Sequence, residues 1–178
     1  MGYQGSSARI PSGGPVTDTR PTPLPPALSA MTLLAASVVV HDRATGRVLL
    51  LRRGDHAKFA PGHWDLPSGK SDPGEPVTAT AVRELHEETG LVVAGESLRL
   101  AHVIHGAWGV EAPNGYMSVV FSATTWSGTA ENREPTKHSA VVWTPVTALP
   151  TPFVPSSSTA LSSYLASAPP SVTLRGWD

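Results

Sequence analysis

The chain has 178 residues, of which 40% are apolar, and its formal net charge is -1. This size and apolar content predict one domain with a sizeable core, and the near-neutral charge argues against a basic face that binds a nucleic acid duplex. The absence of cysteine excludes disulfides, thiolate metal sites and a cysteine nucleophile.

Residues 1–30 are rich in proline, glycine and serine and show no periodicity, so we expect a disordered tail. A signal peptide is the alternative, but the prolines between positions 21 and 26 interrupt the apolar helix that it would need. The strand-like pattern begins directly after Met31, which is therefore a hypothetical functional start. We expect the folded domain over residues 31–168 and a C-terminal tail over 169–178.

Two strands are predicted at the start of the domain, over residues 32–41 and 47–52. The connecting segment 42–46 carries turn-forming residues and ends in glycine, which favours a β-hairpin. No uninterrupted apolar run approaches the ~20 residues of a membrane span. The sequence therefore predicts a soluble, cytoplasmic protein without a membrane contact.

Cationic side chains gather between the second strand and position 70. Oxyanions bind to fixed N–H donors and positive charge, so this group is a candidate for substrate phosphate contacts. Taken singly, each of these residues suits an ordinary solvated loop. The candidate substrate-binding residues are Arg52, Arg53 and Lys70, with His56, Lys58 and His63 in the same segment.

A loop over residues 69–75 leads into the strongest predicted helix, over 76–89. Residues 71–74 are turn formers, and Pro76 suits the first turn of a helix because its missing N–H has no intrahelical partner there. Gly90 is expected to end the helix, since glycine takes positive φ readily.

Three glutamates share one face of this helix. At ~100° per residue, Glu84, Glu87 and Glu88 fall within an arc of ~100°, whereas Leu85 lies on the apolar side. Such like charges repel one another, and an i,i+4 contact between Arg83 and Glu87 offsets only part of the repulsion. Mg²⁺ is bound by carboxylates, waters and substrate phosphates, so a divalent cation would resolve the conflict. A solvated acidic face is the alternative for a bare cluster.

The remaining elements complete an α+β pattern with a mixed sheet. Strands are predicted over 97–105, 117–126 and 139–146, and a closing helix over 156–168, with Ser156 to Ser158 as candidate N-caps. The histidines at 41, 102, 105 and 138 show no metal-ligand spacing and are given no role, and His86 is expected on the helix surface.

The window from Gly69 to Leu91 resembles the Nudix box, the signature motif of the Nudix hydrolases. A match at every defined position of one uninterrupted window is a specific signal. The matching residues are Gly69, Glu75, Arg83, Glu84, Leu85, Glu87, Glu88, Gly90 and Leu91.

This resemblance implies an α/β/α sandwich and a Mg²⁺ or Mn²⁺ cofactor. It implies that the Gly69 carbonyl, Glu84, Glu87 and Glu88 hold the metal, that Arg83 orients these glutamates, and that Glu75 supports the network. Residues 126–137 are similar to the region of MutT-like nucleotide hydrolases in which a loop glutamate serves as metal ligand or base. Glu134 is the candidate, with Glu131 and Glu111 as rivals. The general base is then Glu84 or Glu134.

The leading hypothesis is a Mg²⁺-dependent hydrolase that cleaves a pyrophosphate bond in a nucleoside triphosphate or a related nucleotide. ADP-ribose, a nucleotide sugar or a dinucleoside polyphosphate are alternative substrates. A non-catalytic nucleotide-binding module and a purely structural acidic-faced domain are the other classes, although the intact set of glutamates favours an enzyme. Small members of this family often form dimers, so a homodimer is among the expected states, although no segment marks an interface.

Overall fold

The computed structural model describes residues 31–109, 112 and 114–177. The predicted disordered tail over residues 1–30 lies outside the described residues. Within the described part, no helix is long and apolar enough to cross a membrane.

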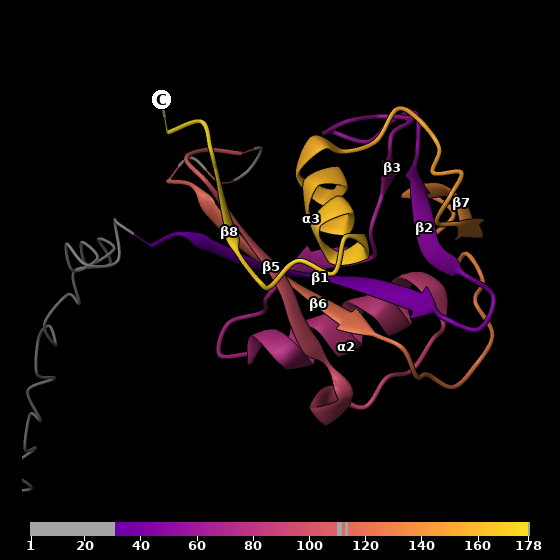
Figure 1. The fold of residues 1–178 in the computed structure, drawn as a ribbon. Helices are drawn as coiled ribbons and strands as arrows, with labels where there is room; N and C mark the ends of the chain where they lie inside the picture. The colour runs from indigo at the N-terminus through magenta and orange to yellow at the C-terminus, as the bar shows by residue number, and fades with distance from the viewer. Residues whose placement is uncertain (1–30, 110–111, 113, 178) are drawn as a thin grey trace, which may run out of the picture. The chain divides into compact units, whose positions relative to one another are not determined.

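The eight strands of the described residues form one mixed sheet in the order β3-β2-β1-β6-β5-β8, with β4 paired to β1 and β7 paired to β2 (Figure 1). The β1–β6 and β5–β8 pairs are parallel and the others are antiparallel. The mixed sheet of the α+β prediction is thus confirmed. The strands are β1 Leu33–Asp42, β2 Arg47–Arg53, β3 Trp64–Asp65, β4 Ser68–Lys70, β5 Arg99–Gly106, β6 Tyr116–Ala123, β7 His138–Pro145 and β8 Val172–Arg175.

The predicted strands are present with ends shifted by a few residues, but β3 and β4 fall in a segment predicted as loop. These two strands span two and three residues and flank Pro67, so they are too short to show an alternating pattern. Their backbones are held by longer neighbours, β3 by β2 and β4 by β1. The pairing of β4 with β1 fixes Gly69 opposite Ala36 in the sheet. It therefore sets the position of a residue that the resemblance implies is a metal ligand.

Helices α2 (Val77–Thr89) and α3 (Pro155–Leu165) pack on opposite faces of the sheet, and Figure 1 shows β1 between them. Alternation along β1 accounts for this arrangement. Val38 belongs to the same buried cluster as Leu85 of α2, whereas Val39 belongs to the cluster that contains Leu161 of α3. The result is the predicted α/β/α sandwich.

Helix α2 follows the prediction closely. Pro76 is its N-cap residue, with φ -62° and ψ 139°, so the helix begins one residue later than predicted. Gly90 adopts φ 76° just past the end, and its N–H donates to the carbonyl of His86. The glycine therefore ends the helix in the left-handed conformation that the sequence predicted.

The C-terminal part differs from the prediction in two ways. Helix α3 begins at Pro155 with Val154 as the N-cap residue and no side-chain cap, so the predicted serine caps are wrong. Ser157 instead donates to the buried Asp65 Oδ1 at 2.5 Å. Residues 169–178, expected as a tail, contain β8, which runs parallel to β5. The side chains of β8 are mostly exposed, so its sequence carries no burial pattern to read.

Candidate active site

The predicted glutamate face of α2 divides into residues of different burial. Leu85, on the other side of the helix, is fully buried in the core. Glu87 is half-exposed, whereas the side chains of Glu84 and Glu88 are 14% and 6% exposed. Burial penalises a charged carboxylate unless partners compensate for lost hydration, so the contacts of these two residues decide the chemistry of the site.

Arg83 connects the exposed half of this face to the preceding loop. Its Nε donates to Glu75 Oε1 at 2.9 Å, and its Nη1 donates to Glu84 Oε1 at 2.8 Å and to Glu87 Oε2 at 3.1 Å. Its Nη2 donates to the Lys70 carbonyl at 3.0 Å. The predicted contact between Arg83 and Glu87 is confirmed, and one guanidinium orients three carboxylates.

Glu75 anchors this guanidinium. The Arg83 side chain lowers the pKa of Glu75 to about 2, with further hydrogen bonds from the Asp72 N–H and the Thr80 hydroxyl. Glu75 therefore stays ionised at any pH near neutrality and holds Arg83 in place. The structure thus brings Glu75 and Arg83 into the arrangement that the resemblance implied.

The resemblance implies that Glu84 and Glu87 hold a metal, so replacing Arg83 with lysine is expected to lower turnover about 10- to 100-fold, as is typical when a group that orients metal ligands is lost. Lysine keeps the charge but presents no planar fork, so it cannot hold Glu75 and two further carboxylates together. Steady-state kinetics at saturating Mg²⁺ check the effect, and wild-type turnover would contradict the orienting role.

Gly69 lies against the carboxylate of Glu84. A Cβ at position 69 would overlap the Glu84 carboxylate, so glycine lets this carboxylate lie directly against the backbone of β4. Burial raises the pKa of Glu84, and Arg83 opposes the shift. The sequence motif thus corresponds here to a physical contact between its first glycine and its central glutamate.

Glu88 is the most buried of the three glutamates. Its Oε2 accepts the Ser68 N–H at 2.8 Å, and its Oε1 lies 3.0 Å from His138 Nε2. Burial raises the pKa of Glu88 to about 7, although His138 and the Ser68 N–H favour the charged form. A bound cation would favour the ionised carboxylate further.

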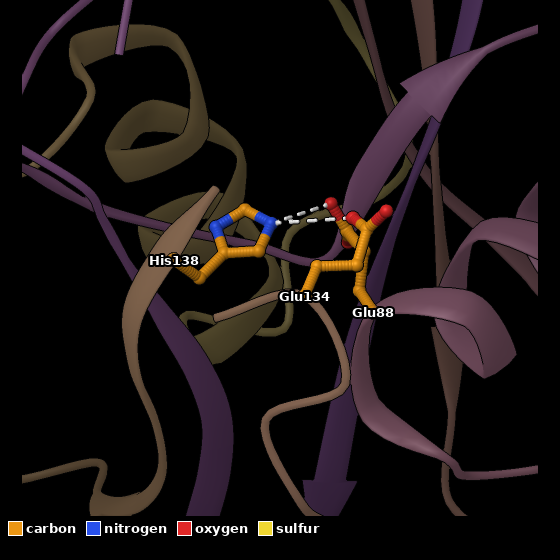
Figure 2. A group of neighbouring side chains, drawn as sticks. All are labelled: Glu88, Glu134 and His138. Carbon is orange, nitrogen blue, oxygen red and sulfur yellow. Dashed lines mark hydrogen bonds and ion pairs between the residues drawn. The ribbon is translucent and has the colours of Figure 1, made fainter. Parts of the chain in front are cut away.

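Glu134 and His138 complete the site from the other side. They lie four residues apart, at a turn that leads into β7, and Figure 2 shows one imidazole nitrogen facing both Glu134 and Glu88. Glu134 Oε2 lies 3.9 Å from His138 Nε2, and its Oε1 pairs with Lys137 Nζ at 2.6 Å. Ligand atoms of Glu88, Glu134 and His138 all lie within 4.8 Å of one another.

The rivals of Glu134 are placed differently. Glu131 is exposed and pairs with Arg133 at 2.9 Å, and Glu111 lies outside the described residues. His138, given no role from the sequence, is the residue that the prediction missed. Its i,i+4 spacing from Glu134 was the available signal in the sequence. However, its hydrogen-bond partner Glu88 is 50 residues away, and no local pattern indicates that contact. His86 is exposed, as expected.

The predicted phosphate-binding cations have unequal surroundings. Arg53 is engaged internally, because its Nη1 lies 3.2 Å from Asp65 Oδ2 and its Nε donates to the Phe59 carbonyl at 2.7 Å. Arg52 is exposed and donates from Nε to the Gly62 carbonyl at 3.3 Å. Lys70 is also exposed, and it directly follows Gly69 in β4. The end of β2 adjoins the Glu134 turn, since the Gly54 N–H donates to the Lys137 carbonyl at 2.8 Å.

Comparison with known proteins identifies one family. The family model described as NUDIX domain matches residues 31–164. Among curated relatives, Nudix hydrolase 3 of Caenorhabditis elegans is 43% identical over 63 residues, which cover 35% of this chain and 25% of that protein. The chain thus matches about a quarter of the length of this relative.

Two solved structures are similar over most of the chain. A MutT NUDIX hydrolase from Burkholderia pseudomallei is 30% identical with a TM-score of 0.61, over 73% of this chain and 95% of that one. The NUDIX domain of Shewanella oneidensis NrtR, in complex with ADP ribose, is 21% identical with a TM-score of 0.65, over 81% and 93% of the two chains. The second likeness concerns the fold alone.

Proposed function

The chain belongs to the Nudix family, and on this premise we propose that it is a divalent-metal-dependent hydrolase of a pyrophosphate bond in a nucleoside triphosphate or a related nucleoside diphosphate derivative. The observation that carries the proposal is the meeting of Glu88, from the acidic face of α2, with Glu134, from a turn more than 40 residues later. Glu84 and Glu87 belong to the same helix, where Arg83 donates to both of them.

The donor set fits a hard cation. Carboxylate and carbonyl oxygens are the ligands that Mg²⁺ and Mn²⁺ prefer, and Glu134 Oε2 is buried without a hydrogen-bond partner among the described residues. An orphaned carboxylate oxygen beside a second buried carboxylate is unfavourable without a positive charge between them. We propose that Glu84, Glu87, Glu88 and the Gly69 carbonyl hold the metal. When bound, the metal screens the phosphate oxygens and lowers the pKa of the attacking water.

The chain's own residues supply the rest of the chemistry. Glu84 and Glu134 are the two candidates for the base that takes a proton from the attacking water. One oxygen of each carboxylate is engaged by a cation, Glu84 Oε1 by Arg83 and Glu134 Oε1 by Lys137. Glu134 Oε2 is buried without a hydrogen-bond partner among the described residues, whereas Glu84 is also proposed to hold the metal. The contacts therefore favour Glu134 for this role. Arg83 would keep the other carboxylates oriented during turnover.

Substrate phosphates would be bound by exposed cations next to the carboxylates. We propose Arg52 and Lys70 for this contact, since both are exposed and Lys70 adjoins Gly69. Arg53 was also predicted to bind substrate, but its contacts support a structural role better. Its guanidinium donates to the Phe59 carbonyl and pairs with Asp65, so it holds the 54–63 loop in place. A homodimer and a cytoplasmic location stay predictions of the sequence analysis.

A substrate panel tests the proposal. The release of pyrophosphate, phosphate and nucleotide products would be measured for nucleoside triphosphates, oxidised dGTP, ADP-ribose, nucleotide sugars and dinucleoside polyphosphates, with Mg²⁺, Mn²⁺ or a chelator. We expect turnover of one class that falls to the blank rate with chelator and returns with added metal. Turnover unaffected by chelator would overturn metal dependence. Nucleotide binding without hydrolysis would indicate a binding module instead.

A further inference from the structure

His138 is a buried histidine at the centre of the carboxylate cluster, with only 7% of its side chain exposed. Its Nε2 lies 3.0 Å from Glu88 Oε1 and 3.9 Å from Glu134 Oε2. Its Nδ1 is buried and has no hydrogen-bond partner among the described residues. Figure 2 shows this second nitrogen on the side of the ring away from both glutamates.

These contacts discriminate between the two neutral tautomers of the ring. A proton on Nδ1 would leave a buried N–H without an acceptor among the described residues. A proton on Nε2 donates to Glu88 and leaves only an acceptor unpaired, which proteins tolerate better than an orphaned donor. The geometry therefore favours the Nε2–H tautomer.

The same contacts argue against metal ligation through Nε2. A histidine that ligates a metal nearly always donates its other ring N–H to a carboxylate or carbonyl group. No such acceptor for Nδ1 is present in the described part of the chain. His138 is thus arranged to donate from Nε2. The lone pair that a metal would need is then on Nδ1, which faces away from both glutamates.

Glu88 is held from two sides by this arrangement. The backbone N–H of Ser68 in β4 donates to Oε2 at 2.8 Å, and His138 at the start of β7 holds Oε1. The carboxylate plane is therefore fixed by two separate strands, while each oxygen keeps a second lone pair. Arg83 donates to Glu84 and Glu87, but no hydrogen bond joins it to Glu88 within the described part of the chain.

We propose that His138 is a positioning residue of the metal site. It orients Glu88, just as Arg83 orients Glu84 and Glu87. As an Nε2–H donor it fixes the Glu88 carboxylate, and it joins the Glu134 turn to helix α2. The inference rests on the proposed function, in which Glu88 holds a divalent cation.

Two amide substitutions separate positioning from ligation. In His138→Gln the side-chain amide reaches the place of Nε2 and can still donate to Glu88, whereas in His138→Asn it reaches only the place of Nδ1. We expect His138→Gln to keep the Mn²⁺ dissociation constant within about threefold of wild type. We expect His138→Asn to weaken Mn²⁺ binding and lower kcat about 10- to 100-fold, the usual cost of losing a group that orients a ligand. Mn²⁺ binding is followed by electron paramagnetic resonance of the free ion.

Spectroscopy on the intact chain gives the second readout. Nitrogen-15 NMR of the His138 ring is expected to show the Nε2–H tautomer without metal. Pulsed electron paramagnetic resonance of the Mn²⁺ complex is expected to lack the strong coupling of a directly bound ¹⁴N nucleus. A directly bound nitrogen that disappears in His138→Gln, an Nδ1–H tautomer, or equal losses of affinity in both variants would overturn the inference.

The metal-binding readouts do not depend on hydrolysis. If the protein binds Mn²⁺ and the two variants differ as expected, but the substrate panel is silent, the proposed reaction fails and the positioning role stands. If hydrolysis is metal-dependent but both variants bind Mn²⁺ as wild type does, the positioning role fails and the reaction stands. Melting temperatures of both variants confirm that each comparison is made on folded protein.

Discussion

Replacing Glu87 with glutamine is expected to lower turnover about 100- to 1,000-fold while leaving the melting temperature unchanged. A metal ion that stabilises the negative charge of the phosphate oxygens in the transition state contributes on the order of several kcal/mol, and Glu87 is proposed to hold that ion. Half of the Glu87 side chain is exposed, and it pairs with Arg83. Arg83 would keep its bonds to Glu75, Glu84 and the Lys70 carbonyl. The change therefore removes a charge that is proposed to bind metal, at nearly constant volume and without opening the core.

The matched control is Glu131→Gln, which makes the same chemical change at an exposed glutamate paired with Arg133. Its kcat and KM should equal those of wild type. Kinetics at several Mg²⁺ concentrations would show whether excess metal rescues Glu87→Gln in part, as expected for a weakened ligand. Turnover near that of wild type in Glu87→Gln would exclude Glu87 as a metal ligand.

Replacing Gly69 with alanine is expected to lower turnover by at least about 100-fold and to weaken Mn²⁺ binding. The added Cβ would overlap the Glu84 carboxylate, so either Glu84 leaves its position or β4 moves away from α2. A displacement of about 1 Å at a reacting group costs on the order of 10²-fold in rate.

Gly95→Ala provides the control for this substitution. A Cβ at Gly95 meets no other atom within 4 Å, and the backbone there does not have positive φ. Its turnover, Mn²⁺ affinity and melting temperature should match those of wild type. If Gly69→Ala also matched wild type in Mn²⁺ affinity and turnover, the close contact between Gly69 and Glu84 would have no part in metal binding.

The sequence alone determined the fold class and the Glu-rich half of the site. A 13-residue helix with its apolar and acidic faces separated is a local property, because residues within one helix have a fixed angular relation. The end of α2 at Gly90 followed from the same local rules, and so did the contact between Arg83 and Glu87 four residues apart. The long strands could also be predicted, because the β-forming residues that mark them are likewise a local property of the sequence.

Only the tertiary structure decided which distant groups join this helix. Glu88 meets His138 across 50 residues and Ser68 across 20, and neither pairing leaves a spacing pattern in the sequence. The strands β3, β4 and β8 are short, and their few residues do not identify the neighbouring strands with which they pair. The reason is physical: periodicity records which face of an element is buried, but not which partner covers it. The sequence therefore predicted the three glutamates of α2, and the fold supplied the histidine that fixes one of them.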